Sequence, residues 1–436
     1  MAELNAHQSE AVRHLDGPLL VLAGAGSGKT RVITRKIAHL IRHADVAPGH
    51  ITAVTFTNKA AREMQGRAAD LLRGTDIAGL TVCTFHNLGL RILRREHRHA
   101  GLKRAFTLLD EQDTGGLVRD LLHGDGDDRA ANLLRWRISR WKGEMITPED
   151  AMAAAESDAD ARDATRYADY QRALRAYNAV DFDDLILLPV TLFREQPEIL
   201  DAWHNRTRYL LVDEYQDTDR SQYELVRRLT GVRGALTVVG DDDQSIYAWR
   251  GAHPENLARL QQDFPRLRII KLEQNYRSVD TILEAANHLI ANNPHVFEKR
   301  LWSELGAGER IRIIPCRNEE AEAGRIVSEI LHHRFRGGTY GDIAVLYRGN
   351  HQAREFEKAL RQHDIPYFLS GGTSFFNRSE VKDVMAYLRL LANRDDDAAF
   401  LRVINLPRRE IGPQTLERLG TYAGQRHCSL LAACGD

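Results

Sequence analysis

The sequence has 436 residues, which is too long for one hydrophobic core, and about 150 residues per domain would give roughly three domains. Hydrophobic residues make up 43% and charged residues 28%, which excludes disordered and fibrous classes. No apolar stretch approaches the ~20 residues of a membrane span, and the N-terminus has no signal-peptide core, so we expect a cytoplasmic protein without membrane contact. The formal net charge of -1 means that any nucleic-acid binding must rest on local features.

Strand and helix signals alternate along the first 86 residues. The apolar segments 18–23, 51–57 and 80–85 are typical of buried strands, and Ile33 and Ile37 share a helical face between the first two. This alternation predicts an α/β fold with a parallel sheet.

The middle of the chain reads as a helical insertion. Residues 87–189 carry helical periodicity, with a helix start at Thr147, and strand signals resume only at 208–214 and 235–241. We therefore predict a first core from segments 1–86 and 190–280, interrupted by a helical insertion at 87–189.

A second α/β unit is expected at 281–376. Strands are predicted at 310–315, 343–348 and 365–371, and helices at 319–333 and 354–363, with no phosphate loop in this unit. Residues 377–436 are predicted to be helical.

A glycine-rich loop follows the first predicted strand and opens a helix, which is the context of a phosphate-binding loop. The loop consists of Ala23, Gly24, Ala25, Gly26, Ser27, Gly28, Lys29 and Thr30. Backbone N–H groups would point at the phosphates, Lys29 would meet the β- and γ-phosphates, and the Thr30 hydroxyl would ligate Mg²⁺. Ala23 stands where the general pattern has glycine, and a turn without a ligand is the alternative interpretation.

An acidic pair ends the strand at 208–214. Asp213 is the predicted metal partner, and Glu214 the predicted general base for water. An Asp-Glu strand end is common in surface turns, but together with the phosphate loop it favours nucleotide hydrolysis.

Several further segments follow in a fixed order: LNAHQ, TFTNKAAREM, TFHNLG, VDEYQDT, VVGDDDQSIYAWRGA, LEQNYRS, LSGGTSFF at 369–376 and REIGP. With the phosphate loop, this series resembles the Rep/UvrD/PcrA family of superfamily 1A helicases along the whole chain. The resemblance implies two RecA-like P-loop NTPase motor cores with helical insertions, and ATP and Mg²⁺ as cofactors. It also implies that ATP lies between the two cores.

The resemblance adds residues to the ATP site. Gln8 matches the family's adenine reader, Tyr276 the residue that stacks on the base, and Arg277 and Gln244 the contacts to the γ-phosphate, with Arg31 beside the loop. For Tyr276 the alternative is core packing, and for Arg277 a surface ion pair.

The same resemblance implies a path for single-stranded DNA. Phe56 and Trp249 match stacking positions, and every base offers a face to an aromatic ring. The other DNA-binding positions are Thr57, Asn58, Thr84, His86, Tyr247 and Arg250. Neutral hydrogen bonds to phosphates would explain DNA binding by a chain of net charge -1. A core role is the alternative for Phe56.

The family implies an ATP-dependent 3′-to-5′ translocase and helicase of single-stranded, 3′-tailed and forked DNA in replication and fork restart or repair, with replisome proteins as candidate partners. Two family motifs expected after the second helical insertion are not found between 376 and 436. We therefore expect an incomplete second core at 281–376, a truncated second insertion at 377–436, slow hydrolysis and no unwinding. Two alternatives stay open: a non-catalytic ATP- and DNA-binding fragment, and a recombination helicase subunit of the RecB or AddA kind.

Overall fold

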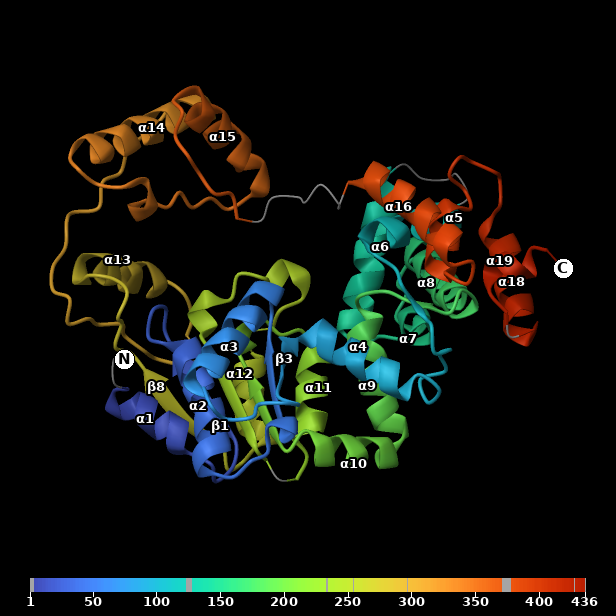
Figure 1. The fold of residues 1–436 in the computed structure, drawn as a ribbon, viewed down its shortest axis with the longest axis horizontal. Helices are drawn as coiled ribbons and strands as arrows, with labels where there is room; N and C mark the ends of the chain where they lie inside the picture. Colours follow the sequence, from blue (N-terminus) through green and yellow to red (C-terminus); the bar gives the residue numbers. More distant parts are fainter. Residues whose placement is uncertain are drawn as a thin grey trace. The chain divides into compact units, whose positions relative to one another are not determined.

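The computed structural model describes residues 4–122, 128–232, 234–253, 255–295, 297–370, 378–426 and 428–435. Contacts between residues divide the chain into two compact units (Figure 1). The core unit comprises residues 1–309 and 389–436, and the small unit comprises residues 310–388.

A six-stranded sheet forms the centre of the core unit, in the order β3-β2-β6-β7-β1-β8. Every neighbouring pair in it is parallel. Its strands are β1 Leu19–Ala23, β2 Ile51–Thr55, β3 Thr81–Thr84, β6 Tyr209–Val212, β7 Leu236–Gly240 and β8 Arg268–Leu272. The five strands predicted for the first core are confirmed, and the edge strand β8 is an addition. Mixed α/β architecture with a parallel sheet flanked by helices is therefore confirmed.

Helices cover both faces of the sheet because successive residues of a strand point to opposite sides. Leu19 and Val21 of β1 face a cluster with α1 Ala6–Arg13, α2 Lys29–His43 and α3 Asn58–Leu71. The intervening Leu20 and Leu22 face the opposite cluster. That cluster is covered by α4 Phe85–Glu96, α9 Asp184–Glu195, α10 Pro197–Arg206, α11 Arg220–Thr230 and α12 Asn256–Asp263.

The close packing of α4 on α9 depends on a glycine. A Cβ at Gly89 would lie 1.7 Å from the Leu185 carbonyl oxygen, so a larger residue would push the two helix backbones apart. Both helices lie partly within the predicted insertion 87–189, yet they pack on the sheet.

A helical layer follows α4 along the chain. It contains α5 Glu111–Leu121, α6 Asp128–Gly143, α7 Pro148–Ala153 and α8 Asp158–Ala176. Its core includes Tyr167 and Tyr170, and Thr147 caps α7 with a capping box, which confirms the predicted helix start. A short parallel pair, β4 Thr107–Leu108 with β5 Ala179–Val180, was not predicted.

A buried ion cluster joins α6 to the start of α9. The Lys142 ammonium group, whose side chain is fully buried, donates to Asp181 Oδ2 at 2.6 Å and to Asp184 Oδ1 at 2.8 Å. The Tyr170 hydroxyl donates to the same Asp181 oxygen at 2.9 Å. Burial disfavours the charge on Lys142, but Asp181, Asp184 and the nearby Asp183 outweigh it and raise the pKa of Lys142 above its usual value.

The helices near the C-terminal end are α16 Ser379–Ala392, α17 Asp397–Val403, α18 Pro413–Arg426 and α19 Leu430–Ala433. Phe400 of α17 and Leu416 of α18 belong to the same apolar cluster as α5 and α8, and Arg402 pairs with Asp113 of α5 at 2.9 Å. Residues 389–436 thus pack with the helical layer, and α13 Asp280–Ile290 also belongs to the core unit. The four predicted domain boundaries themselves stay a prediction.

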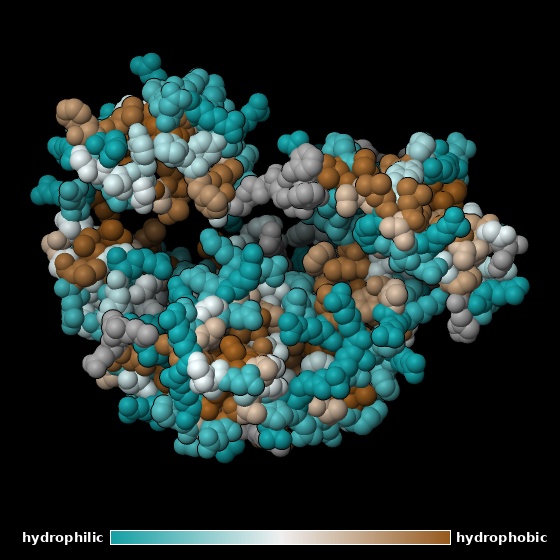
Figure 2. All heavy atoms as spheres, viewed as in Figure 1, coloured by the Kyte–Doolittle hydropathy of each residue, from teal (hydrophilic) through white to brown (hydrophobic). Residues whose placement is uncertain are grey.

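Apolar side chains gather over α16 in Figure 2. Val384 is 59%, Leu388 53% and Leu391 80% exposed.

The small unit forms its predicted helices, α14 Glu319–Phe335 and α15 Ala353–Gln362, but the strand prediction for this unit is wrong. Residues 310–370 contain no strand: segments 310–315, 343–348 and 365–370 belong to no sheet. Ile313 and Leu346 are each 92% exposed. The apolar pattern of a strand gives no sheet unless another strand accepts its hydrogen bonds. Residues 371–377, which include most of the LSGGTSFF segment, lie outside the described residues.

Short 3₁₀ turns complete the structure, at Pro48–His50, Tyr215–Asp217, Asp242–Gln244, Ala248–Arg250, Tyr340–Asp342 and Asn350–Gln352. Among the helices of the described residues, none has the length and apolar character needed to cross a membrane.

Candidate nucleotide and DNA site

Apart from Gln8 in α1, the segments that carry the predicted nucleotide site follow the carboxyl ends of strands. The phosphate loop follows β1, Asp213 follows β6, Asp241 follows β7 and Tyr276 lies beyond β8. Because the strands are parallel, these segments share one edge of the sheet, which is where α/β proteins bind ligands.

The phosphate loop turns from β1 into α2 through two glycines in the left-handed region, Gly26 at φ 71° and Gly28 at φ 92°. The Ser27 hydroxyl donates to the Gly24 carbonyl at 2.7 Å and closes the loop. Ala23 is the last residue of β1 and is fully buried. Alanine can replace the first glycine of the phosphate-loop pattern because this residue still belongs to the strand. The turn itself begins after it.

Three predicted catalytic side chains meet beside this loop. The Lys29 ammonium group lies 3.1 Å from Glu214 Oε2 and donates to Gln244 Oε1 at 2.9 Å. Lys29 comes from the first turn of α2, Glu214 from the end of β6, and Gln244 from the turn after β7. Residues far apart in the sequence therefore form one polar cluster.

The predicted metal ligands lie at the same edge. Asp213 is buried, and burial beside Glu214 raises its pKa to about 7 although Lys29 acts in the opposite direction. Thr30 follows Lys29 in the first turn of α2 and is half-buried. Burial destabilises the charged form of the Asp213 carboxylate, and a nearby cation would stabilise it. Carboxylate and hydroxyl oxygens are also ligands that Mg²⁺ prefers.

Gln8 lies against the phosphate loop and is fully buried. Its amide nitrogen donates to the Ser27 carbonyl at 2.8 Å, and its amide oxygen accepts from the Asn5 backbone at 3.2 Å in a capping box of α1. To read an adenine edge, Gln8 would have to exchange these bonds for bonds to the base.

Tyr276 is 45% exposed, which argues against the core-packing alternative. Its hydroxyl accepts from Asn5 Nδ2 at 2.8 Å and donates to Gln274 Oε1 at 2.8 Å, so one end of the ring is fixed. The exposed ring face meets the basic requirement for stacking on a base.

Arg277 is exposed and starts beside the phosphate loop, where a Cβ at Gly26 would lie 2.8 Å from the Arg277 Cβ. The neighbouring Asn275 donates to the Ala25 carbonyl at 2.5 Å and accepts from the Arg277 backbone at 2.8 Å. Asn275 was missed by the sequence analysis. Arg31 is half-buried at the third position of α2.

The predicted DNA residues after β2 and β3 have structural roles as well. Thr57 caps α3 and Thr84 caps α4, accepting from backbone N–H groups at 3.0 Å and 3.2 Å. Phe56 is half-buried and meets the Phe85 ring edge-on at 5.6 Å, in partial agreement with the core alternative. Burial lowers the pKa of His86.

Asn58, at the start of α3, is exposed. Trp249 is 54% exposed, with the Tyr247 ring 6.3 Å away at an interplanar angle of 49°. Both aromatic residues follow Gln244 in one segment. The side chain of Arg250, the remaining predicted DNA contact, lies outside the described part of the structure.

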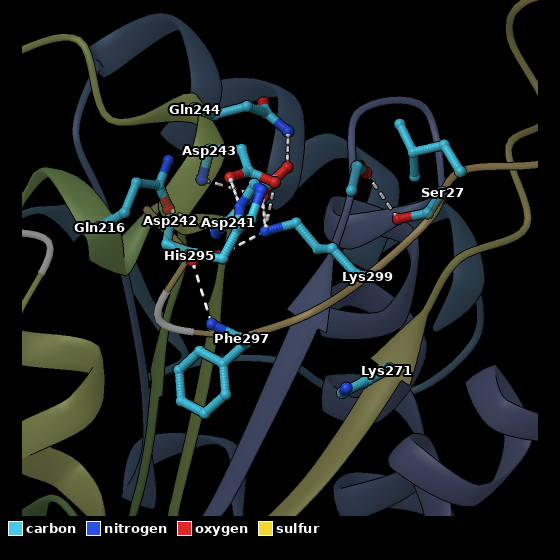
Figure 3. A network of polar contacts seen from close by, with 12 residues as sticks. Ser27, Gln216, Asp241, Asp242, Asp243, Gln244, Lys271, His295, Phe297 and Lys299 are labelled. Carbon is cyan, nitrogen blue, oxygen red and sulfur yellow. Dashed lines mark hydrogen bonds and ion pairs between the residues drawn. The ribbon is translucent and has the colours of Figure 1, made fainter. Parts of the chain in front are cut away.

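Two further residues link this cluster and were missed by the sequence analysis (Figure 3). Gln216 donates to Glu214 Oε2 at 2.8 Å and accepts from the Asp241 backbone at 3.0 Å. Lys299 contacts the carboxylates of Asp241, Asp242 and Asp243. Lys299 lies so far along the chain that no local pattern indicated its partners.

The glycine-rich loop joins a strand to a helix and places a lysine beside the acidic end of another strand. This arrangement defines a P-loop nucleotide-binding protein with a RecA-like sheet. The UvrD/REP helicase N-terminal domain matches residues 4–265, and the UvrD-like helicase C-terminal domain matches residues 270–431. The chain belongs to the UvrD/Rep helicase family.

Relatives support this assignment. ATP-dependent DNA helicase Rep of Salmonella typhimurium and that of Escherichia coli are each 55% identical over 436 residues, 99% of this chain and 65% of the relative. ATP-dependent DNA helicase PcrA of Staphylococcus epidermidis is 43% identical over 99% of this chain and 60% of the relative. The chain thus spans 65% of the length of the two Rep relatives.

Proposed function

We propose that this chain belongs to an ATP-dependent DNA helicase that moves 3′-to-5′ along single-stranded DNA. The observation that carries the proposal is the convergence of Lys29, Glu214 and Gln244 beside a phosphate loop. A cation, a carboxylate and an amide at that place are the groups that bind, hydrolyse and sense a nucleoside triphosphate.

The chemistry follows from the contacts of these side chains. Phosphate oxygens would draw the Lys29 ammonium group away from Glu214, which leaves the carboxylate free to orient water and accept its proton. Gln244, which now accepts from Lys29, would turn its amide to the γ-phosphate. Thr30 and Asp213 would hold Mg²⁺, which supplies positive charge to the phosphates.

A link between nucleotide and DNA favours a motor over a non-catalytic binding module. Gln244 and Trp249 belong to one short segment that includes two 3₁₀ turns. A change in the contact of Gln244 can therefore move the aromatic residue proposed to stack on DNA bases. Movement of bases past an exposed ring needs no sequence-specific contact.

The finer parts of the proposal are supported by the family resemblance. They are the polarity, the use of 3′-tailed and forked duplexes, a role in replication and fork restart or repair, contacts with replisome proteins and a cytoplasmic location. Each of the relatives named above is called an ATP-dependent DNA helicase.

The test is steady-state ATP hydrolysis with and without single-stranded DNA. We expect DNA to stimulate hydrolysis, and Lys29→Ala and Glu214→Gln to abolish it. Lys358→Ala, a change at an exposed lysine of the small unit, is the control and should leave the rate unchanged. DNA-independent turnover that survives Lys29→Ala would refute the proposal. Because this chain alone is expected not to unwind duplex DNA, the polarity is tested with a chain extended to the length of the Rep relatives, which should displace strands from 3′-tailed but not 5′-tailed duplexes.

A further inference from the structure

Residues 297–302, here called the strap, run from the turn after β7 to the phosphate loop. Near one end the Phe297 backbone N–H donates to Asp242 Oδ2 at 3.4 Å. At the other end, a Cβ at Gly24 would lie 2.2 Å from Leu301 Cδ2, so Leu301 packs directly on the loop. The strap therefore contacts both the turn after β7 and the phosphate loop.

The backbone of the strap is firmly held. Lys271 of β8 donates to the Glu298 carbonyl at 2.6 Å, and Asn287 of α13 donates to the Leu301 carbonyl at 2.9 Å. The Asn275 N–H donates to the Trp302 carbonyl at 2.8 Å. A side chain that projects from the strap thus starts from a fixed point.

Lys299 projects from the strap into three carboxylates. Its ammonium group lies 2.6 Å from Asp241 Oδ1 and 2.8 Å from Asp243 Oδ2, and it also pairs with Asp242. The lysine side chain is 5% exposed, and those of Asp241 and Asp242 are 3% and 5% exposed. Burial disfavours the charge on Lys299, but the carboxylates outweigh it and raise the pKa of Lys299 above its usual value.

The three carboxylates lie close enough together to hold a metal ion, with one oxygen of each within 4.8 Å of the others. In this structure the ammonium group of Lys299 supplies the positive charge that such a cluster requires. Without it, the three closely spaced carboxylates would repel one another.

Asp241 connects this cluster to the γ-phosphate sensor. Its Oδ2 accepts a hydrogen bond from the Gln244 amide nitrogen, while Oδ1 faces Lys299. The other end of the Gln244 amide faces Lys29. Lys299, Asp241, Gln244 and Lys29 thus form one chain of contacts in which Lys299 fixes the carboxylate that orients the sensor.

We propose that Lys299 is a positioning residue for Gln244, which it orients through Asp241 so that the site distinguishes ATP from ADP. This inference rests on the proposed function. It adds Lys299, a residue of the strap, to the side chains of the phosphate loop and the acidic strand end that the nucleotide site needs.

The test is calorimetric binding of ADP and of the non-hydrolysable ATP analogue AMPPNP, both with Mg²⁺, because it does not depend on the rate of hydrolysis. Lys299→Met should weaken AMPPNP binding about tenfold, the scale of one lost charged hydrogen bond, and leave ADP binding within about twofold. Lys299→Arg should restore part of the preference for AMPPNP.

The matched control is Lys271→Met, which removes another lysine that contacts the strap but does not contact Asp241. An equal loss of AMPPNP preference in this control would assign the effect to a loosened strap and overturn the inference. A fall in ADP affinity equal to the fall in AMPPNP affinity would overturn it too.

A charge-matched pair of changes separates positioning from simple neutralisation. Lys299→Met combined with Asp242→Asn keeps the net charge of the cluster, so its melting temperature should recover. The preference for AMPPNP should stay low, because Asp241 has still lost its partner. Full recovery of the preference would show that Lys299 only neutralises charge.

A double-mutant cycle with Gln244→Ala completes the test. Lys299→Met should add little to the loss caused by Gln244→Ala if it acts through Gln244. Additive losses would overturn the inference and leave the proposed function intact. If Gln244→Ala leaves the AMPPNP preference unchanged, the γ-phosphate role of Gln244 is wrong, and the inference falls with it.

Discussion

Replacing Lys142 by methionine would remove the only cation of the buried cluster described between α6 and α9. Its ammonium group lies 2.6 Å and 2.8 Å from oxygens of Asp181 and Asp184, and the exposed fractions of these two carboxylates are 8% and 4%. Methionine fills a similar volume, so the main effect is to leave Asp181 and Asp184, with Asp183 close by, without a cation. The Tyr170 hydroxyl can satisfy one oxygen of Asp181 but brings no charge.

The expected cost is large because removing one partner from a buried ion pair destabilises proteins by about 3–5 kcal/mol. The cost should also depend on pH. The pKa of Asp184 is already raised by burial and by Asp181, although Lys142 opposes this, and it should rise further in the variant. A folded-state pKa above the unfolded value stabilises at low pH, and this contribution is lost as the pH rises. The free energy of unfolding of the variant should therefore be lowest near pH 8. Below the raised pKa it should recover by about 1.4 kcal/mol per pH unit for each carboxylate that becomes protonated.

Hydrogen exchange followed by mass spectrometry measures this effect where it occurs. Peptides from α6 and α9 should lose protection after correction for the intrinsic exchange rates, while peptides from β1 and β7 serve as an internal reference. Adding Asp181→Asn and Asp184→Asn to the variant should restore most of the protection. A loss below about 1 kcal/mol, or a loss independent of pH, would refute the assignment of a charge-compensating role to Lys142.

Trp249→Ala should weaken single-stranded DNA binding by ~1–3 kcal/mol in a fluorescence titration, whereas Trp136→Ala, which removes a similarly exposed tryptophan of α6, should not. Gln8→Ala should reduce the preference for ATP over GTP in competition binding, and equal affinity of the parent chain for both nucleotides would contradict the adenine-reading role. Burial raises the pKa of Asp219, the N-cap of α11, to about 6, so the parent should lose stability relative to Asp219→Asn as the pH rises from 4 to 6. Melting curves that stay parallel across this range would contradict that assignment.

The sheet of the core unit could be predicted because its central strands are buried on both faces and read as continuous apolar runs. The edge strand β8 was missed since Arg268 and Lys271 are exposed and interrupt its apolar pattern. The opposite error occurred in the small unit, where segments 310–315 and 343–348 have strand-like patterns but no pairing partner. An apolar pattern predicts which residues are buried, but it does not predict which strands pair with each other.

The site was predictable where its chemistry lies in contiguous motifs. Lys29 and Glu214 are recognisable from their own neighbours in sequence, and the structure brings them within 3.1 Å of each other. Lys299 has no such signal, because its role depends on an ion cluster formed with residues 241–243 after folding. The two threonine caps were likewise predicted only as DNA contacts, although Thr57 and Thr84 each precede a helix in the usual N-cap position.

The order of strands in the sheet imposes an order on folding during synthesis. Strands β2 and β3 are neighbours and can pair as soon as both have left the ribosome, but β1 ends at Ala23 and its two partners begin only at Leu236 and Arg268. A nascent chain therefore carries an unpaired, wholly apolar strand while the whole helical layer is being made. That strand is a natural target for chaperones and for aggregation, and the phosphate loop attached to it cannot take its final shape until translation has passed β8.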